Sequence, residues 1–397
     1  MTAQAVRPER AGEGYAPDFA VLVEGNEVDR TARNDIRRIQ VTANLEDMSS
    51  VSLTFNNWDE QTLRYKYSES QSGVFAIGNR VEVHLGYGGN LLRVYAGPIT
   101  SLQATYPESG APTIAIGSTD SMQKLKNRKA GDSDPVVYRK QADWQIAKKI
   151  AGRHQLGVHV DEQGPEHDLV VQKNQSDAAF LMERAKRIDF ECFIRPDPNT
   201  GKDTLHFVRP TDGRTAGADD QAHYFQLAYG PGLAGEPQPA GVEEALIPNL
   251  ISFSPSLTLS GQVSSVTVRG WNPRTKDSLV YKATRKDLPP GRGLTGPAAA
   301  DQALGGRGET VIDAPVATQE EARELATALL RERSYGFVTA TGRIAGLPEL
   351  TPGDNLDIHG VGTRFSGQYY VLQVVHTLDT SGFFTEFTGR RVYDGTR

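Results

Sequence analysis

Residues 78–84 read Gly-Asn-Arg-Val-Glu-Val-His, and residues 353–359 read Gly-Asp-Asn-Leu-Asp-Ile-His. The two stretches lie 275 positions apart and share the glycine, two apolar positions and the final histidine. In each, apolar side chains alternate with polar ones, which is the pattern of a β-strand with one buried face. The repeated strand motif predicted from this pattern consists of Gly78, Val81, Val83, Gly353, Leu356 and Ile358.

A second pair of stretches extends the repeat. Residues 95–102 (Tyr-Ala-Gly-Pro-Ile-Thr-Ser-Leu) align with residues 365–372 (Phe-Ser-Gly-Gln-Tyr-Tyr-Val-Leu) at an offset of 270. The difference between the two offsets falls in the hairpin loop, where a change of length costs little free energy. We therefore expect Gly97 and Gly367 to be equivalent, each at a bulge or a positive φ that curves the sheet. The alternative, that any two hairpins look alike, stays open at this stage.

The composition is that of a folded, turn-rich protein. The 397 residues include 40 glycines and 22 prolines, which favour many short strands, and the length suggests two or three domains. The net charge of −6 argues against a specific nucleic-acid protein with a basic surface. A single cysteine, Cys192, excludes an intrachain disulfide. No apolar run reaches the roughly 20 residues of a membrane helix, and no signal peptide is evident, so we expect no stable membrane insertion and assembly in the cytoplasm.

Periodicity along the chain predicts an α+β fold that is mainly antiparallel β, with two related β-barrel domains flanking a small α/β insertion. Helical spacing is clear at residues 142–154 and 176–186, whereas the Gly-, Pro- and Ala-rich residues 289–308 suggest a mobile loop. The predicted divisions are a flexible arm (1–17), a first β-barrel domain (18–117), an α/β insertion (118–210), a linker (211–247) and a second β-barrel domain (248–397) with a helix near 318–334.

Motifs that could carry chemistry are weak. The Gly-x-Gly-x-x-Gly pattern at residues 291–296 has no strand directly before it, as a dinucleotide-binding loop requires, so it is interpreted as a loop. His154, His159 and His167 lack the close ligand pairs of a zinc site, and Cys192 lies in an apolar strand. Among 49 acidic residues no carboxylate pair can be chosen. We therefore predict no catalytic residue, no cofactor, no metal and no enzymatic activity.

Several segments together resemble the phage late-control protein D family, the tail-tip and baseplate hub proteins of contractile phage tails and contractile injection systems. The resemblance rests on residues 85–89 (Leu-Gly-Tyr-Gly-Gly), 94–101, 175–185, 263–273, 350–354 and 365–371, in that order. Asp189 departs from the family pattern, because it stands where a glycine is usual. The matching segments span nearly the whole chain, from Phe19 to Arg391.

The resemblance implies a structural role, as a homotrimeric hub between a hexameric inner tube and a trimeric spike. Two related domains per chain fit this role, because a closed trimer then presents six units. The implied partners are an inner tube protein, a spike protein and other baseplate proteins, and the implied location is the bacterial cytoplasm during assembly and then a phage tail or injection particle. Two alternatives stay open: a tail-associated peptidoglycan hydrolase, and a free-standing carbohydrate-binding β protein.

Overall fold

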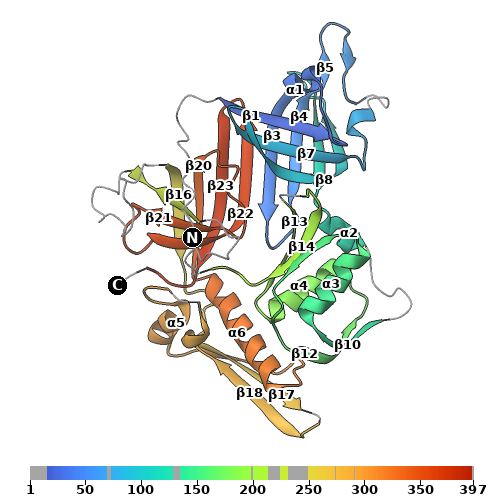
Figure 1. The fold of residues 1–397 in the computed structure, drawn as a ribbon. Coiled ribbons are helices and arrows are strands. Elements are labelled where there is room, and N and C mark those ends of the chain that lie inside the picture. The colour runs from blue at the N-terminus through green and yellow to red at the C-terminus, as the bar shows by residue number, and fades with distance from the viewer. Residues whose placement is uncertain are drawn as a thin grey trace.

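The computed structural model describes residues 16–68, 73–127, 135–197, 200–212, 224–230, 249–272, 274–289 and 291–395. The predicted N-terminal arm lies outside the described residues except at its end, where the first strand begins at Pro17. The fold is mainly antiparallel β with a few helices, as predicted, and the chain is elongated, with the N-terminal strands at one end (Figure 1).

The first region is a curved sheet around its own apolar core. Its fully buried core residues include Ile39, Leu53, Phe55 and Ile116. Its elements are β1 (Pro17–Val23), β2 (Asn26–Glu27), α1 (Arg30–Asp35), β3 (Ile36–Asn44), β4 (Ser50–Asn56), β5 (Trp58–Asp59), β6 (Arg64–Tyr65), η1 (Gly73–Phe75), β7 (Arg80–Tyr87), β8 (Asn90–Thr105) and β9 (Thr113–Thr119).

The insertion places helices against small sheets. Both predicted helices are present, and α4 begins where the Ser176 hydroxyl accepts a hydrogen bond from the Ala179 N–H. Ile146, Ile150 and Leu181 from these helices are fully buried in one apolar cluster. The elements are α2 (Met122–Asn127), β10 (Val136–Ala142), α3 (Asp143–Arg153), β11 (Gly157–Val160), β12 (Glu166–Gln172), α4 (Asp177–Arg187), β13 (Glu191–Pro196) and β14 (Asp203–Val208).

The second region combines a sheet with a helical layer below it (Figure 1). Its elements are β15 (Tyr224–Ala228), β16 (Leu250–Leu257), β17 (Ser265–Asn272), β18 (Asp277–Ala283), η3 (Arg285–Asp287), α5 (Gly296–Leu304), β19 (Gly308–Val311), α6 (Gln319–Tyr335), β20 (Val338–Ala345), β21 (Asn355–His359), β22 (Gly367–Asp379) and β23 (Gly382–Arg391).

Two expectations need correction here. The predicted linker contains β15, a short strand that pairs in parallel with β21; residues 213–223 and 231–248 of that linker lie outside the described residues. The predicted mobile loop contains α5 and β19. Pro297 does not prevent this helix, because it lies in the first turn, where no backbone N–H is needed, and the Thr295 hydroxyl caps the helix.

One 13-stranded sheet passes through both regions. Its path is β16-β20-β23-β22-β3-β4-β9-β8-β7-β1-β2, with β21 and β15 attached beside β22. The two regions join where β22 pairs with β3, and within the described residues the path is open at both ends. The sheet also contains a repeat of six strands: the order β3-β4-β9-β8-β7-β1 recurs as β16-β20-β23-β22-β21-β15, with the chain order of the strands preserved. The last pair differs, being antiparallel in the first unit and parallel in the second.

Candidate functional site: a duplicated strand unit and its polar face

The turn that opens each repeated motif has the same geometry twice. Gly78 and Gly353 both have a φ of +95°, a conformation that side-chain-bearing residues rarely adopt. The Gly78 N–H donates to the Ile99 carbonyl at 2.8 Å, and the Gly353 N–H donates to the Val371 carbonyl at 2.8 Å. The carbonyl of the residue after each glycine accepts a return bond, at 2.8 Å from the Ile99 N–H and at 2.9 Å from the Val371 N–H. The two copies are therefore one hydrogen-bonded unit.

The apolar residues of the motif point into the cores. Val81, Val83, Leu356 and Ile358 are all fully buried, two in the core of each region. The polar residues between them are half-buried, and each strand holds a histidine beside a carboxylate: His84 lies 3.7 Å from Glu82 and His359 lies 3.2 Å from Asp357. Strand alternation thus separates an apolar from a polar face in both copies.

The predicted equivalence of Gly97 and Gly367 is wrong by two residues. Val81 pairs with Gly97, but its counterpart Leu356 pairs with Tyr369, so Gly97 corresponds to Tyr369. Gly367 has a φ of +117°, whereas Gly97 is not among the described glycines with positive φ. Gly97 is needed for close approach instead, since a Cβ there would lie 2.5 Å from the Tyr95 hydroxyl oxygen. The aromatic-glycine pattern misled the alignment because it recurs at two different strand positions.

Bulges fix the corrected register. One extra residue interrupts the pairing of β8 with β9 at Thr100, and one interrupts the pairing of β22 with β23 at Leu372. In the same way an extra residue lies at Arg37 of β3 and at Ile251 of β16. Both pairs of bulges fall at matching places in the repeated strand order, and a bulge bends its strand and fixes the register of pairing. The first unit therefore maps onto the second strand by strand, including strands with no visible sequence similarity.

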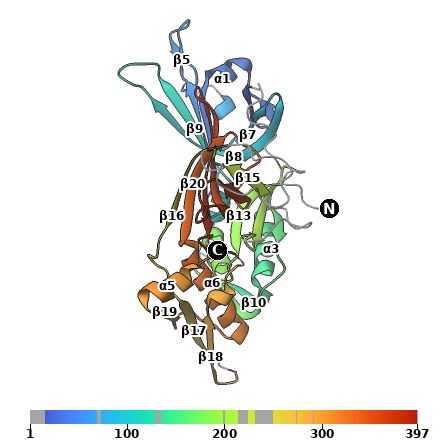
Figure 2. The same ribbon diagram turned by 90° about the vertical axis from the view of Figure 1, so that its left-hand side faces the viewer.

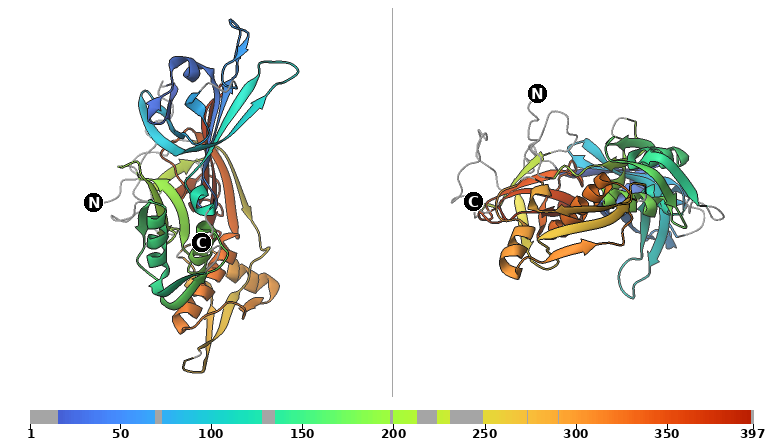
Figure 3. Two further views of the ribbon diagram at one scale, coloured as in Figure 1. Left: turned by 90° about the vertical axis from the view of Figure 1, so that its right-hand side faces the viewer. Right: turned by 90° about the horizontal axis from the view of Figure 1, so that it is seen from below.

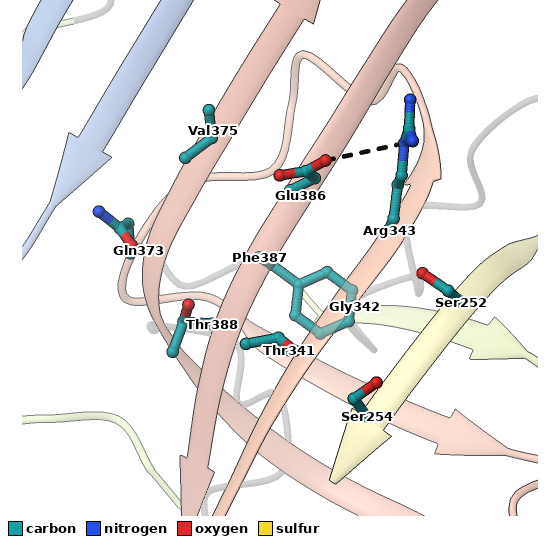
Figure 4. A pocket seen from close by; sticks show the side chains of 10 residues that line it. All are labelled: Ser252, Ser254, Thr341, Gly342, Arg343, Gln373, Val375, Glu386, Phe387 and Thr388. Carbon is teal, nitrogen blue, oxygen red and sulfur yellow. Dashed lines mark ion pairs between the residues drawn. The ribbon is translucent and has the colours of Figure 1, made fainter.

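The sheet presents a polar face that crosses the junction between the two units. Paired residues on this face form rows across the strands, and most members carry hydroxyl or amide groups. One row reads Ser252, Arg343, Glu386, Val375, Thr42 and Ser50, and the next reads Ser254, Thr341, Thr388, Gln373 and Asn44. Arg343 and Glu386 form an ion pair at 3.8 Å, so the charges in these rows are balanced (Figure 4).

A hollow of about 360 Å³ lies on this face over β16, β20, β23 and β22. Figure 4 shows the short hydroxyl side chains of Ser252, Ser254 and Thr341 around it, with the Arg343–Glu386 pair at one end. A surface of this kind offers many weak hydrogen bonds and no strong anchor, since hydrogen bonds between neutral groups contribute about 1 kcal/mol each.

A larger groove of about 1010 Å³ lies between the first region and the insertion, and residues 348–352 of the second region also line it. One wall is a stack of side chains on the insertion sheet: the rings of Phe193 and His206 lie 4.8 Å apart and nearly parallel, and the Arg195 guanidinium lies 5.2 Å from the Phe193 ring centre. Burial lowers the pKa of His206 to about 3, so this imidazole is neutral near pH 7. This wall of the groove is therefore aromatic, and its stacked imidazole carries no charge near pH 7.

Two carboxylates at the groove have opposite pKa shifts, as acid–base pairs in hydrolases do. Burial raises the pKa of Asp120 to about 6; burial also acts on Asp203, but hydrogen bonds from Arg80 and Ser121 hold the pKa of Asp203 below its usual range. Every oxygen of the pair is engaged. The Asp120 oxygens accept backbone N–H groups at 2.8 and 2.9 Å, and the Asp203 oxygens accept Arg80 at 2.8 and 3.1 Å. The arrangement joins β7 to the insertion.

The histidines considered as metal ligands lie in separate ion pairs or stacks. His154 lies 2.8 Å from Asp177, His159 packs 5.3 Å from the ring of His206, and His167 lies between Asp143 and Glu321. Among the residues that the structure describes, no group of three or more potential ligands is placed to hold a metal ion.

The cysteine and the tryptophans differ in burial. Cys192 is buried in β13, and burial raises the pKa of its thiol to about 12, so it is not a ready nucleophile. Trp58 and Trp144 are partly buried, whereas Trp271 is 56% exposed.

Helix α6 is tied to the insertion at both ends by contacts that the sequence did not reveal. Near its start, Glu321 lies 2.6 Å from His167 Nδ1. Near its end, the Arg331 guanidinium and the Tyr335 hydroxyl each donate to Asp189 at 2.8 Å. Asp189 has a φ of +55°, a conformation that favours glycine, and its carboxylate is what makes these two bonds possible. The departure from the family pattern at this position therefore has a structural explanation.

Solved structures similar to this chain include phage tail proteins and a secretion-system component. The 43 kDa tail protein of prophage MuSo2 from Shewanella oneidensis is 14% identical, with a TM-score of 0.64 over 95% of this chain and 98% of that chain. A tail protein from Neisseria meningitidis MC58 is 14% identical, with a TM-score of 0.63 over 95% and 97%. The E. coli c3393 protein, a component of the type VI secretion system, is 12% identical, with a TM-score of 0.55 over 95% and 78%. At the level of the fold, the resemblance to tail proteins is confirmed.

The family follows from a sequence profile. The Alg8 N-terminal domain profile matches residues 15–203 and 247–380, and the chain belongs to this family. Comparison with curated protein sequences finds no match. Among the described residues, no helix is both long enough and apolar enough to cross a membrane.

Proposed function

We propose that this protein is the structural hub of a phage-tail-like contractile injection machine, a homotrimer that joins a hexameric inner tube to a trimeric spike. The observation that carries the proposal is the duplicated six-strand unit, whose two copies lie side by side in one sheet. Three chains then supply six similar units, so a threefold assembly can match a sixfold tube at one end. The first unit falls largely within the first of the two related domains expected from the sequence, and the second unit adds β15 to the other. The described strands form one open sheet rather than two closed barrels.

The polar face supports the same role. It crosses the junction between the units, from β16 in the second unit to β4 in the first, and its rows consist mainly of serine, threonine, glutamine and asparagine. We propose that this face lines the axial channel. A neutral, hydroxyl-rich wall suits a channel because it hydrates well and binds a passing molecule only weakly. The inner tube protein, the spike protein and other baseplate proteins are the proposed partners.

The similar proteins support an assembly role of this kind. One is described as a component of the type VI secretion system, and two are phage tail proteins. We infer that this chain works without catalysis, as part of such a particle after assembly in the bacterial cytoplasm. Peptidoglycan hydrolysis is the less favoured alternative, because the carboxylate pair at the groove has its oxygens engaged by Arg80 and by backbone N–H groups.

Native mass spectrometry of the purified chain, alone and mixed with its spike protein, tests the proposal. A trimer in either sample is the expected result. A chain that stays monomeric in both samples contradicts the hub assignment. Turnover of purified peptidoglycan by the same sample, lost in an Asp120→Asn variant, would favour the hydrolase alternative instead.

A further inference from the structure

We propose that the two open edges of the sheet pair with each other between copies of this chain, the end of β8 in one copy lying antiparallel to β16 of the next. The number of copies rests on the proposed trimeric hub, whereas the pairing itself rests on the repeat. The first open edge is the second half of β8. β7 pairs with β8 only as far as Pro98, and of the strands that the structure describes only β9 pairs with residues 101–105. The second is β16, which pairs only with β20 among the described strands.

The chain contains a template for this contact. In the second unit, β22 corresponds to β8, and its first half likewise pairs with a neighbouring strand, β21. Its second half does not stay open, because residues 373–379 pair with residues 38–44 of β3. β22 corresponds to β8, and β3 corresponds to β16. The internal junction β22–β3 is therefore equivalent to a junction between β8 and β16, which one copy cannot make by itself.

The matching bulges set the register of the proposed contact. Thr100 corresponds to Leu372, so Leu102 of β8 corresponds to Val374 of β22. Arg37 corresponds to Ile251, so Ala43 of β3 corresponds to Leu257 of β16. Val374 and Ala43 are direct partners in the internal junction. Leu102 is therefore expected opposite Leu257 of the neighbouring copy.

The same register brings exposed apolar side chains together. In a single copy Leu102 is 42% exposed and Leu257 is 36% exposed, and the register makes them direct cross-strand partners. Tyr106, 53% exposed just beyond β8, is placed opposite Phe253 of the neighbouring copy. These apolar groups lose contact with water only if the two edges meet, which favours the association.

The two edges also lack charged residues, which are one of the usual protections against pairing. Edge strands of monomeric proteins commonly carry charged residues that discourage another strand from adding. Residues 100–106 and 251–258 contain no Asp, Glu, Lys or Arg. Pro255 removes one N–H from β16, a feature tolerated in edge strands. Figure 2 shows β16 on the outer side of β20, and Figure 3 shows the hairpin of β8 and β9 projecting beyond the sheet.

A disulfide can report this register directly. In the double variant Leu102→Cys/Leu257→Cys, the new cysteines lie at opposite ends of the sheet path within one chain, with β9, β4, β3, β22, β23 and β20 between them. Across the proposed interface they are direct partners with Cα atoms about 5 Å apart, within disulfide range. The matched control is Leu102→Cys/Ser254→Cys, whose cysteines would lie about 10 Å apart along the strand and face opposite sides. The native Cys192 is buried and can remain.

The full-length variants are oxidised mildly and run on a non-reducing denaturing gel. We expect covalent trimers from the first variant and at least tenfold less cross-linked product from the control. A trimer in native mass spectrometry that gives no cross-link in the first variant overturns the edge pairing but leaves the hub proposal intact. A ladder of cross-linked species on the gel, without a discrete trimer in native mass spectrometry, supports the pairing and overturns the trimeric hub. A chain that is monomeric in native mass spectrometry both with and without the spike protein, and that gives no cross-link in the first variant, overturns both proposals.

Discussion

Replacing Glu191 with glutamine should remove part of the pH dependence of the protein's stability. Glu191 lies at the start of β13 with 11% of its side chain exposed, 3.7 Å from the Arg390 guanidinium. The Tyr370 hydroxyl donates a hydrogen bond to it at 2.6 Å. Burial, only partly offset by Arg390 and Tyr370, raises the pKa of Glu191 to about 7.

The magnitude follows from the difference between the folded and unfolded chain. Glutamate titrates near pH 4.3 when unfolded, so the gap of roughly 2.7 pKa units corresponds to about 4 kcal/mol. Because the pKa is higher in the folded state, the stability contribution of Glu191 is fully present below about pH 4.3 and is lost as the pH rises through about 7. Between pH 5 and pH 8 the free energy of unfolding should therefore fall by about 2–3 kcal/mol on account of this one group.

Urea unfolding at pH 5, 6, 7 and 8 measures this effect. The Glu191→Gln variant keeps the shape of the side chain but cannot ionise. Between pH 5 and pH 8 its free energy of unfolding should therefore fall by about 2–3 kcal/mol less than that of the wild type. The matched control is Glu46→Gln, because Glu46 lies 4.0 Å from the same Arg390 but is 69% exposed. Parallel pH profiles for the wild type and Glu191→Gln would refute the reasoning. If Glu46→Gln reduced the pH dependence of the stability by the same amount, the effect would come from the neighbouring arginine rather than from burial.

Three further changes test other parts of the structure. Gly78→Ala should destabilise the protein by about 1–2 kcal/mol, because the residue has a φ of +95°. Gly152→Ala should instead stabilise it by up to about 1 kcal/mol, because Gly152 lies in an exposed and uncrowded turn of α3. The urea midpoints of the two variants test both expectations. Leu356→Ala should cost about 2–5 kcal/mol by leaving a cavity, and Asp357→Ala on the polar side of the same strand much less, in the same assay. Burial lowers the pKa of His167, but Asp143 and Glu321 outweigh it and raise the pKa overall. The protein should therefore become more stable when the pH is lowered from 8 to 6, and His167→Gln should reduce this gain. An unchanged gain in the variant would contradict the prediction.

The sequence predicted the parts of the fold that depend on local pattern. The alternation in residues 78–84 and 353–359 identified β7 and β21 as counterparts, and the glycine before each strand proved to make the same turn. The helices of the insertion were found from their spacing, and the helix predicted near residues 318–334 is α6, which begins after the capping residue Thr318. In these cases the residues that determine the structure are neighbours along the chain.

The rest of the repeat could not be found in the sequence, because the two units share the pairing of their strands rather than the identity of their residues. β4 corresponds to β20, yet Leu53 in the first strand matches Gly342 in the second, and only their positions opposite β9 and β23 relate them. The link between Asp189 and α6 joins residues about 140 positions apart, which no local pattern can show. The loop predicted at residues 289–308 became a helix because capping and an alanine-rich stretch outweighed its glycines.

Whether the open edges yield a ring or a filament depends on geometry that one chain already contains. An interface between two different edges is head-to-tail, and such interfaces close only if each step is the right fraction of a turn. The step from the first unit to the second is set within the chain by the β22–β3 pairing. If the β8–β16 contact copies that pairing, every step around the assembly is nearly the same. Closure after three chains then requires each step to be about one sixth of a turn with almost no rise. The internal junction thus sets the geometry that the interface repeats. We expect a substitution that changes the twist at β22–β3 to open the ring, even though the substituted residue lies far from either edge.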